Sequence, residues 1–198
     1  EVAAVPAVEI PAAPAVLSGP EYLATLPGAA APLGIFDPLG LAGKVDANSV
    51  KKWREAEIKH GRVSMLAVLG LIVQEIAHPL YRGGEDLGPA TFHMQAVEQD
   101  FPLAPVSLLL LVGVFEANNI YMGWKMQSIK EGVAPLKDGF EPGNFGFDPL
   151  GLLPKDEAGA MAMKTKELNN GRLAMIAVLG VWLQEIAEHQ TIFQHFGF

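Results

Sequence analysis

The sequence predicts an all-α membrane protein with three transmembrane helices, of which the first and third form a crossed pair about a pseudo-twofold axis. The main observation is an internal repeat, supported by an apolar composition and by the charges of the loops. Residues 54–70 (REAEIKHGRVSMLAVLG) return as residues 164–180 (KTKELNNGRLAMIAVLG), and both copies continue into Gln-Glu-Ile-Ala at 74–77 and 184–187. Two copies of an apolar helix with a Glu and an Arg at fixed spacing predict a pseudo-symmetric pair that holds a ligand.

The composition limits the class of protein. Half of the 198 residues are hydrophobic and the formal net charge is -8, with a mean hydropathy of +0.25. Such a chain is too acidic for a nucleic-acid binder and too apolar for an ordinary soluble acidic protein. The absence of cysteine excludes disulfides, thiolate metal sites and thiol nucleophiles. Walker and dinucleotide-binding glycine patterns are missing too, so we do not expect soluble Rossmann or kinase chemistry.

Three apolar segments, residues 63–77, 103–120 and 173–187, are candidates for membrane helices. A span needs roughly 20 residues, so each segment must extend into its flanks. Lysine and arginine gather before the first segment and between the second and third, whereas Arg82 is the only cation between the first and second, and nothing after Arg172 is basic. This alternation predicts three spans, with the N-terminus on the positively charged side.

The chain divides into an extended Ala/Pro-rich arm at residues 1–20 and a single membrane domain at 21–198. Ser49 or Asn48 is the predicted N-cap of the first helix. Between the first two helices we expect a Gly-rich acidic loop, and between the last two a long polar connection. The predicted helices cover about residues 49–78, 102–127 and 156–188.

The charged residues of the repeat predict how the two helices meet. Glu57 and Arg62 are separated by roughly 140° around their helix and do not face each other, and the same holds for Glu167 and Arg172. Pairing Glu57 with Arg172, and Glu167 with Arg62, would neutralise all four charges inside the membrane. These pairs are either a purely structural salt-bridge lock or part of a binding site.

Ligand-type residues accompany the glutamates. His60 and Asn170 follow the glutamate of their own repeat by three residues, and Gln74 and Gln184 lie about 21 Å further along each helix. Carboxylate, imidazole and amide groups are all competent axial ligands for magnesium. Two layers of such groups suit flat macrocycles stacked against the helices. For the amide side chains taken singly, an interhelical hydrogen bond is the alternative.

Two other functions compete with this interpretation. Residues 57–60 form a Glu-x-x-His motif, which di-iron carboxylate proteins use twice, but the second copy has Asn170 in place of the histidine. An ion-coupled transporter also combines repeats with intramembrane charges, yet neither repeat has a Gly/Pro break at mid-membrane.

The repeat motifs at residues 54–62 and 166–175, with Phe-Asp-Pro-Leu-Gly boxes at 36–40 and 147–151, resemble the light-harvesting chlorophyll-binding family. In detail they are most similar to the fucoxanthin chlorophyll a/c-binding proteins, over about residues 20–190. The resemblance implies three membrane helices, with the two repeats crossing as a pair and the middle helix leaning alongside.

The resemblance also implies roles for individual residues. Arg62 and Arg172 form the salt-bridge lock, and Asp37 and Asp148 of the boxes lie beside the ends of two carotenoids. Leu108 stands where the family often has a further glutamine, so one middle-helix chlorophyll is absent or held by water. Four histidines match no motif of the family, and we expect a loop or interface role for them: His78, His93, His189 and His195. The implied magnesium ligands of chlorophylls are Glu57, His60, Gln74, Glu116, Glu167, Asn170 and Gln184.

The implied function is light harvesting, with chlorophyll a, chlorophyll c and fucoxanthin or a related carotenoid as cofactors. No bond is made in this process, so we predict that the protein is not an enzyme. The expected partners are a photosystem core, neighbouring antenna subunits and membrane lipids, with no nucleic acid. The expected location is the chloroplast thylakoid membrane, with a multi-pass topology and a stromal N-terminus. Alternatives are a photoprotective energy-quenching member of the same family and, in a different class, a small membrane transporter.

Overall fold

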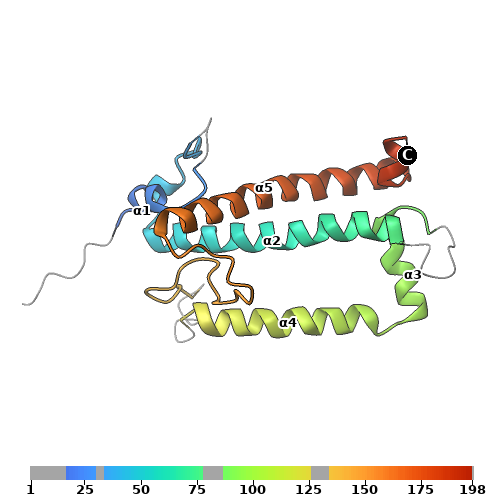
Figure 1. Ribbon diagram of the computed structural model, residues 1–198, viewed down its shortest axis with the longest axis horizontal. Helices are drawn as coiled ribbons and strands as arrows, with labels where there is room; N and C mark the ends of the chain where they lie inside the picture. The colour runs from blue at the N-terminus through green and yellow to red at the C-terminus, as the bar shows by residue number, and fades with distance from the viewer. Residues whose placement is uncertain (1–16, 30–33, 78–86, 126–133, 198) are drawn as a thin grey trace, which may run out of the picture.

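A computed structural model describes residues 17–29, 34–77, 87–125 and 134–197. Its two longest helices, α2 (Ala47–Ala77) and α5 (Glu157–Glu188), contact each other and run side by side. In the view of Figure 1, α4 (Ala104–Gly123) lies on the side of α2 that is opposite to α5. The shorter helices gather near the ends of the long ones, and they are α1 (Gly19–Thr25), η1 (Ala42–Lys44), η4 (Ala90–Phe92), α3 (His93–Asp100) and α6 (Ile192–His195).

The helices α2 and α5 approach each other most closely at one glycine from each repeat. A Cβ atom placed on Gly61 would lie 3.0 Å from the Cα of Gly171, and one placed on Gly171 would lie 2.9 Å from the Cα of Gly61. Only residues without a side chain allow two helix backbones to come this near. A Cβ on Gly70 or Gly180 would meet no described atom within 4 Å. The first glycine of each repeat therefore serves the contact, and the second faces open space.

Large apolar side chains lie on the outside of the long helices. Leu66 of α2 is 71% exposed, Ile176 of α5 is 72% exposed, and leucine, valine and phenylalanine of α4 are similarly open. By length and composition, α4 is the one helix in the described part of the chain that could cross a membrane. The protein thus presents broad apolar surfaces that its own described residues do not cover.

The helices begin at slightly different residues from those predicted. The carboxylate of Asp46 accepts hydrogen bonds from the backbone N–H of Ser49 at 3.2 Å and from its hydroxyl at 2.6 Å. Asp46 therefore caps α2, and the prediction of Ser49 or Asn48 as N-cap was wrong. The predicted middle helix starts two residues later, at Ala104. His78, residues 126–127 and most of the N-terminal arm lie outside the described residues.

Residues 90–100 form η4 and α3, although the sequence predicted a loop there. A helix of three to eight residues is too short to show a reliable apolar period. It is also too short to be stable alone, so tertiary contacts must hold it in place. One such contact comes from α5, where Glu185 accepts a hydrogen bond from the backbone of η4.

Replacing Gly61 with alanine tests the close approach. The new Cβ would press on the Gly171 backbone, which cannot rotate away, and we expect a loss of about 1–3 kcal/mol in the free energy of unfolding. The matched change Gly70→Ala adds a Cβ in open space and improves helix propensity, so it should be neutral or slightly stabilising. Thermal unfolding in detergent, followed by far-UV circular dichroism, is the measurement. Equal melting temperatures for the two variants would contradict the contact.

Candidate functional site

Two ion pairs join the repeats beside the glycine contact. Arg172 donates from Nε to Oε1 of Glu57 at 2.7 Å, and Arg62 donates from Nε to Oε1 of Glu167 at 2.7 Å. Each glutamate is thus paired with the arginine that the repeat predicts for it. Their side chains are between 28% and 39% exposed, so the pairs are partly shielded from solvent. We call these four residues the ion-pair layer.

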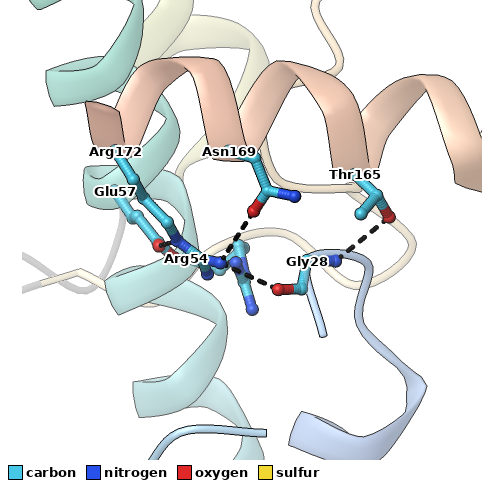
Figure 2. Close-up of polar contacts among 6 residues, drawn as sticks. All are labelled: Gly28, Arg54, Glu57, Thr165, Asn169 and Arg172. Carbon is cyan, nitrogen blue, oxygen red and sulfur yellow. Dashed lines mark hydrogen bonds and ion pairs between the residues drawn. The ribbon is translucent and has the colours of Figure 1, made fainter. Parts of the chain in front are cut away.

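Among the residues that the structure describes, an additional cation joins the ion-pair layer on one side only. Arg54, 8% exposed, donates from Nη1 to Oε2 of Glu57 at 2.7 Å, so two guanidinium groups converge on this one carboxylate in Figure 2. The equivalent residue of the second repeat, Lys164, is paired with Glu141 instead. Our sequence reasoning missed Arg54, although its spacing of three residues from Glu57 was a usable signal.

A glycine turn docks on each repeat through equivalent positions. The N–H of Gly28 donates to Oγ1 of Thr165 at 3.2 Å, and its carbonyl accepts from Nη1 of Arg172 at 2.8 Å (Figure 2). The N–H of Gly143 donates to Oε2 of Glu55 at 2.6 Å, and Glu55 is the counterpart of Thr165 in the repeat. Both glycines have a positive φ, 103° and 79°, which a residue with a side chain adopts only under strain. The segment before the first box is therefore tied to the ion-pair layer through Arg172, and the segment before the second box is tied to Glu55, two residues before Glu57.

The two Phe-Asp-Pro-Leu-Gly boxes form the same turn. Asp37 and Asp148 each accept two backbone N–H bonds, from residues four and five positions later, at 2.9 to 3.0 Å. These bonds favour the ionised form and lower the pKa of both carboxyl groups. Their contribution to stability is present at neutral pH and is lost only as the pH falls below about 4, through the lowered values.

A cavity of about 610 Å³ opens beside the Glu57 side of the ion-pair layer. Apolar and aromatic groups form part of its wall, and charged groups of the layer lie at its edge. Its lining includes Phe36, Asp37, Trp53, Arg54, Glu57 and Arg172. The cavity suits a molecule that has an apolar body and a polar end.

Four of the predicted ligands, His60, Gln74, Asn170 and Gln184, are exposed on the surfaces of α2 and α5. With Nδ1 of His60 protonated, the ring donates to the carbonyl of Ala56 at 2.7 Å, and the lone pair of Nε2 remains available for a metal. The amide nitrogen of Gln184 lies 3.3 Å from the ring of His195. Polar groups displayed on otherwise apolar helices fit an external macrocycle that covers the apolar surface and takes one axial ligand.

Glu116 is the predicted ligand on α4. Its Oε2 accepts from Nζ of Lys59, on α2, at 2.6 Å, and its Oε1 accepts a longer bond from Asn119 at 3.4 Å. Sequence reasoning did not predict this partner, because nothing in the repeat indicates which residue of α2 faces α4.

The repeated Gln-Glu-Ile-Ala segments contain two buried glutamates that sequence reasoning missed. Glu75 is 7% exposed and accepts from the backbone N–H of Ile192 at 2.8 Å, at the start of α6. Glu185 is 1% exposed and accepts from the N–H of Thr91 at 2.8 Å, in η4. Each glutamate thus holds the short helical segment that follows the other repeat. Their equivalent places in the repeated Gln-Glu-Ile-Ala segment were the sequence signal that could have identified them.

The described histidines without an assigned role lie at this same end of the protein. His93 is buried and its Nε2 contacts a backbone carbonyl at 2.8 Å. His195 is paired with Glu188 at 2.7 Å, and His189 ends α5 with a φ of 53°. His78 lies outside the described residues.

Comparison with known proteins identifies the family. The family described as chlorophyll A-B binding protein matches residues 22–186, which is most of the chain. The chain belongs to the chlorophyll a/b-binding protein family. Members of this light-harvesting family bind pigments and are not enzymes, and their fold is a helical membrane fold.

Several relatives are similar over most of the chain. The light-harvesting complex stress-related protein 3.2 of Chlamydomonas reinhardtii is 46% identical over 88% of this chain and 68% of its own length. The fucoxanthin-chlorophyll a-c binding protein of Isochrysis galbana is 42% identical over 93% of this chain and 87% of its own length. The photosystem I chlorophyll a/b-binding protein 5 of Arabidopsis thaliana is 35% identical over 78% and 62%. All three are named as chloroplastic, which supports a plastid location.

The additional arginine predicts unequal effects of two equivalent substitutions. Glu57→Gln leaves both Arg54 and Arg172 without their carboxylate, whereas Glu167→Gln leaves only Arg62. We expect a loss of about 3 kcal/mol in unfolding free energy for Glu57→Gln and about 1–2 kcal/mol for Glu167→Gln, because only the first change also strands the buried Arg54 and because Glu57 is the less exposed of the two glutamates. Denaturant unfolding measures both. If Glu167→Gln were the more harmful change, the asymmetry of the layer would be refuted.

Proposed function

We propose that the protein is a light-harvesting antenna that binds chlorophyll a, chlorophyll c and fucoxanthin or a related carotenoid and transfers excitation energy to a photosystem. The observation that carries this proposal is the display of ligand-type polar side chains at equivalent places on two clamped apolar helices. The similarity to a fucoxanthin-chlorophyll a-c binding protein over 93% of the chain supports the choice of pigments.

The proposed magnesium ligands use oxygen and nitrogen donors that the structure presents at helix surfaces. Glu57 and Glu167 each have their charge balanced by arginine of the other repeat, so that a carboxylate can serve as a ligand in an apolar setting. The remaining ligands of the proposal are His60, Gln74, Glu116, Asn170 and Gln184.

The pigments supply the absorption of light, and the protein supplies position and electrostatic surroundings. Axial side chains fix where each macrocycle lies, and the ion-pair layer fixes the relative placement of the two repeats. The cavity beside Asp37 suits the polar end of a carotenoid, and the matching turn at Asp148 is the proposed place for a second one. Fixed separations and orientations of pigments are what energy transfer requires.

We propose that α2, α4 and α5 all cross the thylakoid membrane, with the N-terminus in the stroma. A helix of 31 residues such as α2 is about 46 Å long, which exceeds the hydrocarbon thickness of roughly 30 Å. Protease added to vesicles of opposite orientation should cut residues 134–156 and residues 87–100 in different preparations. Cleavage of both segments from the same side would exclude three spans.

The proposed partners are a photosystem core, neighbouring antenna subunits and membrane lipids. The broad apolar surface of the long helices supports contact with lipid and pigment. The 35% identity to a photosystem I chlorophyll a/b-binding protein supports association with a photosystem.

A second candidate function is photoprotective quenching of excitation energy. It is favoured by the 46% identity to a relative that is named stress-related. The fluorescence lifetime of the isolated pigment complex separates the two functions. A lifetime of nanoseconds supports an antenna, and a lifetime shortened severalfold supports a quencher.

The absorption and fluorescence excitation spectra of the purified complex test the proposed function most simply. An antenna should show chlorophyll and carotenoid bands, and excitation of the carotenoid should produce chlorophyll a emission. A colourless purified protein would overturn the proposal and favour a transporter.

Individual ligands can be tested by pigment counting. Asn170→Leu and Gln184→Leu should each lose about one chlorophyll per chain and keep the fold, because neither change leaves a charge without a partner. Asn118→Leu is the matched control, since Asn118 is an exposed amide on α4 without a proposed ligand role. Pigment extraction after reconstitution gives the stoichiometry. The two ligand assignments fail if all three variants retain the full complement.

A further inference from the structure

The ion pair between Lys59 and Glu116 lies outside the symmetry of the repeat. Lys59 corresponds to Asn169 in the second copy, and Asn169 accepts from Nη1 of Arg172 at 3.3 Å instead of pairing with an acid. The two copies therefore differ at the position where α2 faces α4. Glu116 is the only charged residue of α4, so the cation for it must come from another element.

The surroundings of Lys59 hold its ammonium group against Glu116. Its Nζ lies 2.6 Å from Oε2 of Glu116, 3.9 Å from Oε1 of Glu55 and 5.7 Å from the centre of the Phe145 ring. The Lys59 side chain is 24% exposed, whereas Glu116 is 45% exposed. The ring and the buried Glu55 shield the lysine from solvent, while the carboxylate of Glu116 stays open to an external ligand.

A carboxylate that binds the magnesium of a chlorophyll keeps its negative charge, because magnesium and the macrocycle are together neutral. In an apolar span such a charge is costly unless a cation balances it. The repeat glutamates obtain that cation from the arginine of the opposite repeat. The geometry of Lys59 matches this arrangement for Glu116.

We propose that Lys59 is a positioning residue for a chlorophyll bound by Glu116. It neutralises the carboxylate and holds Oε2, so that Oε1, which among the described residues accepts only the 3.4 Å bond from Asn119, is the oxygen presented to magnesium. This inference rests on the proposed function, and specifically on Glu116 as a ligand.

The test uses the full chain reconstituted with chlorophyll a, chlorophyll c and fucoxanthin. Lys59→Met should lose about one chlorophyll per chain and the corresponding band in the low-temperature absorption difference spectrum. Lys59→Arg should retain both, since it keeps the cation. Lys125→Met is the matched control, because it removes a lysine paired with Asp138 at 2.8 Å on the exposed connection after α4, and it should retain every pigment.

The double variant Lys59→Met with Glu116→Gln separates positioning from a structural tie. Glutamine offers a neutral carbonyl oxygen that needs no cation, so the double variant should regain the lost chlorophyll. If Lys59 only tied α2 to α4, the double variant would stay one chlorophyll short, and the inference would be overturned. A full complement in Lys59→Met would overturn it as well.

Failure of the proposed ligand role of Glu116, or of light harvesting itself, would be seen in other experiments. Glu116→Leu removes the ligand itself, and a full chlorophyll complement in that variant would refute both the ligand role of Glu116 and the inference built on it. A wild-type protein that takes up no pigment at all would instead refute light harvesting.

Discussion

The approach of α2 to α5 at Gly61 and Gly171 is the constraint on which the rest of the structure depends. With the two backbones this close, arginine from each helix reaches glutamate on the other at 2.7 Å. The turns at Gly28 and Gly143 then dock on groups adjacent to these pairs. The cavity lies beside the Glu57–Arg172 pair, and both residues line it.

Removing one member of an ion pair in this layer is expected to cost more free energy than the intact pair contributes to stability. Ion pairs that are about one-third exposed contribute modestly, because solvent screens them. Removal of one partner leaves a charge in a poorly solvated place, which costs several times more. Charges paired between helices need not face lipid, so the ion pairs are compatible with the proposed membrane placement of α2 and α5. By length and composition, α4 is the one described helix that could cross a membrane.

The ion pairs could be predicted from the sequence because of the repeat. Each copy carries a glutamate and an arginine at the same positions, so the acid of one helix can meet the base of the other. Features that break the repeat could not be predicted in this way. Lys59 on Glu116 is one example, because the second copy has Asn169 at that position. Arg54 on Glu57 is another, because the equivalent Lys164 pairs with Glu141 instead of with Glu167. The short helices η4 and α6 were missed because their stability comes from tertiary contacts rather than local periodicity. The ligand assignments remain predictions from sequence and resemblance.

The pairing across the repeats is tested most directly by comparing two double variants of the pigment-bound protein. Glu167→Gln with Arg62→Leu removes both members of one pair, whereas Glu57→Gln with Arg62→Leu removes one member of each. Thermal loss of visible circular dichroism gives the stability of both. The first double variant should be more stable than Glu167→Gln alone, and the second less stable than either of its single variants. Equal stability of the two double variants would show that the charges are not paired between the repeats.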